Sequence, residues 1–105
     1  MASAYLFLTT ASSLKEARKL TGILLRHRAA ACVTILPKAE SHYRWKEKIE
    51  KAAEFVLLIK TKPSAVKRVE TLLEKHHSYS VPEIIGLPIE KGSSKYLSWL
   101  KKEVR

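Results

Sequence analysis

The sequence predicts an α+β domain in which one antiparallel sheet carries both main helices on one face. The expected element order is strand, helix, strand, strand, helix, strand and a short C-terminal helix. A length of 105 residues, 46% of them hydrophobic and 29% charged, suits one domain over residues 1–105 with one buried core. Right-handed crossovers then join two strand–helix–strand units into the ferredoxin-like arrangement.

The first third of the chain supplies two strands and the helix between them. Residues 4–9 are a near-continuous apolar run, which is typical of a central strand buried on both faces. Ser13 and Glu16 have capping-box spacing, with Ser13 as N-cap and Glu16 reaching back to its amide, so a helix of about four turns begins here. Residues 30–36 predict the second strand, which Pro37 is expected to end.

Residues 42–60 predict a long extended β-arm, interrupted near residues 51–53. Tyr43, Trp45 and Ile49 alternate with basic residues, which indicates one packed face and one solvated, basic face. Glu47 breaks this alternation and indicates a bulge or a subunit boundary. An arm of this length overhangs so small a domain, and an unpaired strand edge favours pairing with another chain.

The second main helix is expected to begin at Pro63, whose fixed φ suits a first helical turn. Apolar residues at helical spacing lead to His76. This spacing places His76 at the edge of the core and turns His77 toward solvent.

Residues 81–89 predict a further strand. Pro82 and Pro88 cannot donate to a strand ladder, so this strand is expected either at an edge of the sheet or with irregular points of entry and exit. Ser93 or Ser94 then caps the short C-terminal helix.

Charge and cysteine content narrow the function classes. Twenty Lys and Arg against ten Glu give a net charge of +10, which raises nucleic acid or an anionic membrane as partners. The charges are spread along the chain, and no apolar run approaches a membrane span, so we expect a solvated basic surface and no membrane partner. Cys32 is the only cysteine, which favours a reducing compartment, and we expect the cytoplasm.

Catalysis has little support in the sequence. Cys32 lies within an expected strand with no histidine near it in the chain, and the three glycines form no phosphate-binding loop. We therefore expect a binding or signalling module and not an enzyme.

The turn between the second helix and the last strand is the densest group of polar side chains. His76, Tyr79 and Glu83 could face one small volume there, because Pro82 keeps the turn out of helical conformation. One interpretation is a metal or ligand site. The alternative is structural: His76 packs at the helix end, and Glu83 bonds to backbone amides or to Tyr79.

Several segments in order resemble the CutA family of divalent-cation tolerance proteins. They are residues 30–37 (AACVTILP), 43–50 (YRWKEKIE), 57–61 (LLIKT), 77–85 (HSYSVPEII) and 96–100 (YLSWL). The resemblance implies a ferredoxin-like domain that forms a homotrimer by strand pairing between subunits. It also implies a role in tolerance of copper and other divalent cations, with no catalytic reaction.

The resemblance also implies site residues. The positions that match the family's metal-linked residues are His76, His77 and Glu83, with Tyr79 as a further ligand or turn residue. Thr9 replaces a cysteine that some bacterial members carry, which argues against a thiolate site for Cu(I). Cu(II) or another divalent cation is the expected guest, and none is required for folding.

The arm carries two further expectations. Tyr43 and Trp45 are expected at the trimer interface, and Glu47 stands where the family commonly has glycine. The alternative function is a basic ferredoxin-like nucleic-acid-binding module, with Tyr43 and Trp45 stacking on bases. The RNA-recognition aromatic consensus is absent from the strands, which argues against nucleic acid.

Overall fold

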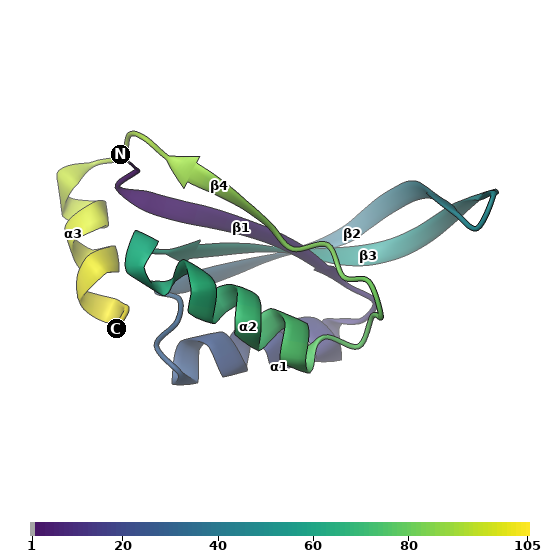
Figure 1. The fold of residues 1–105 in the computed structure, drawn as a ribbon, viewed down its shortest axis with the longest axis horizontal. Helices are drawn as coiled ribbons and strands as arrows, with labels where there is room; N and C mark the ends of the chain where they lie inside the picture. Colours follow the sequence, from purple (N-terminus) through teal and green to yellow (C-terminus); the bar gives the residue numbers. More distant parts are fainter. Residues whose placement is uncertain (1) are drawn as a thin grey trace.

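The computed structural model describes residues 2–105, which form an antiparallel sheet in the order β2-β3-β1-β4 with helices α1 and α2 on one face (Figure 1). The strands are β1 (Ala4–Ala11), β2 (Cys32–Trp45), β3 (Lys48–Thr61) and β4 (Ile85–Ile89). The helices are α1 (Leu14–Arg26), α2 (Val66–His76), which follows a 3-10 turn at Pro63–Ala65, and α3 (Ser94–Glu103). The predicted ferredoxin-like fold class is confirmed.

The main core lies between the sheet and helices α1 and α2. Its largest members come from β1, β3 and the two helices, and are Phe7, Leu20, Leu24, Leu57, Ile59, Val69 and Leu73. Each such side chain contributes about 1.5–3 kcal/mol when it is fully buried. Ser13 caps α1 as predicted, because its hydroxyl accepts the Glu16 amide at 3.1 Å. The core and the cap together fix where α1 begins and which face it buries.

Strand β2 does not end at Pro37 as expected. It continues to Trp45 through a bulge between Leu36 and Ala39, where Lys38 adopts a φ of 59°. A proline is tolerated here because β2 is an edge strand, and the bulge absorbs the missing donor. Residues 38–41, beyond the expected end of the strand at Pro37, are therefore part of it.

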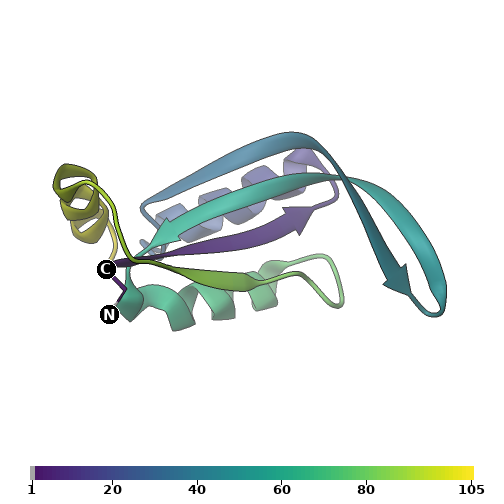
Figure 2. The ribbon, with the colours of Figure 1, turned by 90° about the horizontal axis from the view of Figure 1, so that it is seen from above.

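The extended arm at residues 42–60 is a β-hairpin. Strand β2 turns back into β3 through Lys46 and Glu47, whose φ values are 48° and 68°, and Trp45 pairs with Lys48 across the turn. Two successive residues with positive φ are typical of a two-residue hairpin turn. Glu47 therefore breaks the alternation because it is a turn residue and not because of a bulge, whereas its place at a subunit boundary stays a prediction. The hairpin gives the chain a length of 44 Å (Figure 2).

The turn also changes the face assigned to Ile49. Ile49 pairs with Arg44, and directly opposed residues of an antiparallel pair point to the same face. It therefore lies on the basic side and not with Tyr43 and Trp45, as the alternation had suggested. Ile49 is 72% exposed.

Strand β4 lies at the sheet edge, as the prolines predicted. It begins at Ile85, later than the expected residue 81, because residues 81–84 still belong to the turn that follows α2. Ser93 caps α3 by accepting the Tyr96 amide at 3.2 Å. None of the helices in residues 2–105 has both the length and the apolar character that crossing a membrane requires.

Helices α1 and α2 lie on one face of the sheet and leave the opposite face largely uncovered within the chain (Figures 1 and 2). This uncovered sheet face consists of the exposed Leu36, Ile85 and Leu87 and the half-buried Leu6, Leu8, Val56 and Leu58. The register brings them together, because Leu8 pairs with both Leu58 and Ile85. Soluble monomers rarely leave a contiguous apolar surface of this kind open.

Candidate functional site

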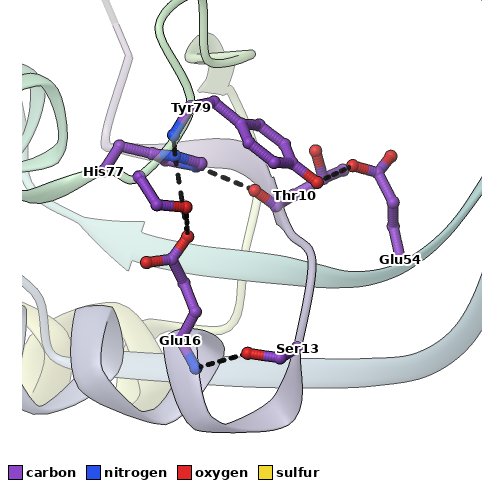
Figure 3. A network of polar contacts seen from close by, with 7 residues as sticks. Thr10, Ser13, Glu16, Glu54, His77 and Tyr79 are labelled. Carbon is purple, nitrogen blue, oxygen red and sulfur yellow. Dashed lines mark hydrogen bonds and ion pairs between the residues drawn. The ribbon is translucent and has the colours of Figure 1, made fainter.

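The turn after α2 is fixed to strand β1 by His77 (Figure 3). The His77 side chain is fully buried. Its Nε2 lies 2.8 Å from the Thr10 carbonyl oxygen, and its Nδ1 lies 3.1 Å from the Tyr79 amide nitrogen. A carbonyl only accepts and an amide only donates, so the ring is a neutral imidazole with its proton on Nε2.

The expectation that His77 faces solvent is therefore wrong. His77 is the residue at which α2 ends, and its backbone is extended, with φ −72° and ψ 141°. The helical spacing that assigned its direction no longer applies there. The ring instead falls onto the end of β1.

A second link joins the same turn to helix α1. The Ser78 hydroxyl donates a hydrogen bond to the Glu16 carboxylate (Figure 3). Glu16 thus serves the turn, and not the Ser13 amide as its capping-box position had suggested. A Glu16 oxygen also lies 3.9 Å from Nδ1 of His77, but that nitrogen already accepts the Tyr79 amide. The turn is consequently held to both β1 and α1.

Tyr79 joins the turn to strand β3. Its hydroxyl donates to a carboxylate oxygen of Glu54 at 2.7 Å, and its ring packs against His77 with centroids 4.9 Å apart. Burial, followed by the hydrogen bond to Glu54 and the charge of that carboxylate, raises the pKa of Tyr79. The phenol therefore stays protonated and keeps its donor role.

Glu54 is the most buried carboxylate of the site, with 7% of the residue exposed. Burial acts to raise its pKa, but hydrogen bonds from Ser41, Tyr79 and Thr10 outweigh burial, so the pKa lies below its ordinary value. Glu54 is thus a buried, ionised carboxylate that accepts the Tyr79 hydroxyl at 2.7 Å, with the hydroxyl groups of Ser41 and Thr10 also acting to lower its pKa.

Above Glu54 lies a cleft of about 670 Å³ between the hairpin and the turn. It is lined by Thr10 of β1, by Ser41, His42, Tyr43 and Trp45 of β2, by Glu54 of β3, and by residues 79–83 of the turn. This volume lies within the range of small-ligand sites, roughly 300–1,000 Å³. The cleft is therefore the candidate ligand site of the chain.

The predicted site residues are distributed unevenly around this cleft. Tyr79, Glu83, Tyr43 and Trp45 line it, whereas His76 is half-exposed at the end of α2 and is not among the lining residues. Sequence reasoning missed Glu54. A signal was present, because Glu54 is a lone carboxylate between two alanines and an apolar strand segment.

A protein-family model described as CutA1 divalent ion tolerance protein matches residues 5–103 of the chain. The chain belongs to the CutA1 family. Family membership confirms the resemblance carried by the sequence motifs.

The chain is similar in sequence and structure to CutA proteins over nearly its whole length. The divalent-cation tolerance protein CutA of Pectobacterium atrosepticum is 40% identical over 105 residues, covering all of this chain and 96% of that protein. The crystal structure of CutA from Xylella fastidiosa has a TM-score of 0.96 at 39% identity, covering 99% of this chain and 100% of that one. The chloroplastic CutA of Arabidopsis thaliana is 40% identical over 91% of this chain, but the chain spans only 53% of it.

The CutA1 name relates the family to divalent ions, which makes the side chains that could coordinate a metal ion relevant. No group of three or more His, Cys or Glu side chains in residues 2–105 could hold a metal ion. His77 has both ring nitrogens committed to the backbone. Thr9, at the position of the bacterial cysteine, is fully buried in the sheet. A single chain therefore does not fit a resident metal ion.

Proposed function

We propose that the protein acts as a homotrimer in the tolerance of divalent metal ions, copper among them, by binding and not by catalysis. Membership of the CutA1 family supports the relation to divalent ions. The family resemblance implies three copies. The single observation that carries the assembly is the uncovered sheet face, since an apolar surface of this extent is stabilised when another copy covers it.

The hairpin supports the same assembly. Strand β2 is an edge strand with free backbone groups along its outer side, which is a template for pairing with another chain. Tyr43 and Trp45 on this strand are 45% and 44% exposed in one chain. We propose that a neighbouring copy covers them.

The test of assembly is the mass in solution. Light scattering of the wild type is expected to give the mass of three chains of 11.9 kDa each. Leu87→Lys, on the uncovered sheet face, should shift the mass toward the monomer. Leu25→Lys is the matched control, because Leu25 is similarly exposed but lies on α1. A stable wild-type monomer at micromolar concentration would contradict the proposal.

Copper is proposed as an exchangeable ligand and not as a structural cofactor. With His77 committed, the donors left at the turn are the half-exposed His76 and the exposed Glu83. Imidazole and carboxylate suit Cu(II) or Zn(II), but two donors need water or a donor from another copy to complete a site. We propose that another copy in the assembled protein provides the missing donor.

Calorimetric titration with Cu(II) tests the proposed donors. His76→Ala and Glu83→Gln should each weaken binding, and Glu90→Gln is an exposed control outside the turn. Equal affinity in all four proteins would remove the turn from copper binding.

A nucleic-acid role remains the alternative, because Tyr43 and Trp45 are exposed beside basic residues. It predicts binding that weakens steeply with salt in a filter assay.

The cytoplasm is the proposed location. A lone Cys32 suits a reducing compartment. Immunoblotting of fractionated cells checks this, and recovery of the protein outside the cytoplasmic fraction would contradict it.

A further inference from the structure

Glu54 forms no ion pair with a cationic side chain in residues 2–105. The ion pairs among residues 2–105 join other groups, and the Tyr79 hydroxyl that donates to Glu54 is neutral. His77 is the one nearby ring whose charge could act on Glu54, but both of its nitrogens are bonded to the backbone as a neutral imidazole. Buried charges in proteins are nearly always paired with an opposite charge. A positively charged group from outside the chain would supply that pairing.

The lining of the cleft has the opposite charge to the rest of the protein. Twenty of the 105 residues are Lys or Arg, yet within residues 2–105 none of them lines the cleft. Two carboxylates, Glu54 and Glu83, do line it. In a chain of net charge +10, this is a local site that attracts cations.

Aromatic rings form part of the walls. Tyr43 and Trp45 contribute rings from the hairpin, and Tyr79 contributes one from the turn. The faces of such rings attract organic cations, by about 0.5–2 kcal/mol per contact. A hydrated metal ion gains little from aromatic walls, whereas an alkylammonium has both a charge for the carboxylate and an apolar body for the rings.

We propose that this cleft binds a primary alkylamine in its ammonium form, with the charged nitrogen at Glu54 and the carbon chain against the sides of Tyr43 and Trp45 that line the cleft. The neighbouring copy of the proposed trimer then covers only the outer sides of these two residues. A diamine suits the cleft further, because Glu83 offers a second carboxylate. The site shares Glu83 with the proposed copper donors but needs neither copper nor His76.

The competing occupant is a lysine or arginine side chain from a second copy of this chain. It would satisfy Glu54 with the same chemistry. In that case the cleft would be filled in the assembled protein, and a free amine would find no space.

Calorimetric titration of the full chain with putrescine, in buffer free of metal, distinguishes these cases. Butane-1,4-diol is the matched neutral ligand, since it has the same carbon chain without charge. The wild type should bind putrescine and not the diol. Glu54→Gln should weaken putrescine binding about tenfold or more, which corresponds to the loss of one charge-assisted hydrogen bond.

Two further variants keep the test decisive if Glu54→Gln fails to fold. Glu83→Gln changes an exposed side chain and should weaken putrescine several-fold while leaving butylamine unchanged. Glu74→Gln, exposed on α2 and away from the cleft, should leave both unchanged.

Equal binding of putrescine and the diol would overturn the proposal, as would equal putrescine affinity in the wild type and Glu54→Gln. Absence of putrescine binding together with dissociation of Glu54→Gln in light scattering would also overturn it. That result would assign the cationic group to a second copy.

Discussion

Replacing His77 by alanine separates a structural histidine from a metal ligand. The wild-type ring donates to the Thr10 carbonyl and accepts from the Tyr79 amide while fully buried. His77→Ala removes both partners at once and leaves a void between the turn and β1. We therefore expect a large loss of stability in protein that has no metal bound.

The magnitude follows from three terms. Each backbone group left buried without a partner costs about 1–3 kcal/mol, and the void adds the cost of lost packing. Partial entry of water reduces these costs. The expected loss in unfolding free energy is about 3–5 kcal/mol, a large part of the roughly 5–15 kcal/mol that stabilises a typical domain.

Urea unfolding in the presence of a chelator, at one protein concentration, measures the effect. A loss of about 4 kcal/mol lowers the midpoint by about 2 M for a domain of this size. His76→Ala is the matched control, because it also removes one imidazole but from a half-exposed position, and should cost less than about 1 kcal/mol. Nitrogen-15 spectra of the wild type should show a neutral His77 ring with its proton on Nε2.

Equal small losses in the two variants would refute the structural role of His77. The same conclusion would follow if His77→Ala lost stability only when the wild type carried Cu(II). Either result would return His77 to the set of metal donors that the sequence motif implies.

Four other outcomes are expected. Glu47→Gly should stabilise the protein by about 0.5–1 kcal/mol in urea unfolding, because a φ of 68° strains any other residue; an unchanged midpoint would contradict this. Gly86→Ala should destabilise it by about 1–3 kcal/mol in thermal unfolding, because the new Cβ would lie 2.8 Å from the Phe7 ring, and a tolerated alanine would show that the ring moves freely. Since the pKa of Glu54 is lowered in the folded state, its stabilising contribution is present above its unfolded pKa and lost as pH falls through the folded pKa. Stability should thus fall less steeply with acid in Glu54→Gln, and parallel curves would argue against it. The raised pKa of Tyr79 acts in the other direction, with a contribution present below about 10 and lost as pH rises through the folded pKa. Ultraviolet titration should show one late-ionising phenol that Tyr79→Phe removes, and its persistence in that variant would assign it elsewhere.

Features set by neighbouring residues were predictable from the sequence. The Ser13 cap needs only the Glu16 amide three residues later, and the apolar spacing after it needs only one face to bury. The edge position of β4 followed from two prolines that cannot donate. These features depend on residues that lie close together in the sequence.

Features set by distant residues were not predictable in the same way. Strand β2 continues through Pro37 only because no strand in residues 2–105 pairs with the outer side of β2. The direction of His77 depends on where α2 ends and on the Thr10 carbonyl, far away in the chain. Glu54 becomes part of a site only when the turn brings Tyr79 to it. A local pattern carries no information about such partners.

The tight turn at Lys46 and Glu47 has a consequence for how the chain folds. The pairs nearest this turn, beginning with Trp45 and Lys48, join residues close in the sequence, whereas β1 and β4 join opposite ends of the chain. Loop closure costs least for the local pairs, so we expect the hairpin to close early and β4 to dock late. In stopped-flow folding, Glu47→Gly should then accelerate folding and leave unfolding nearly unchanged. Faster closure of the hairpin would also shorten the time for which the backbone groups of β2 that pair with β3 are left without partners.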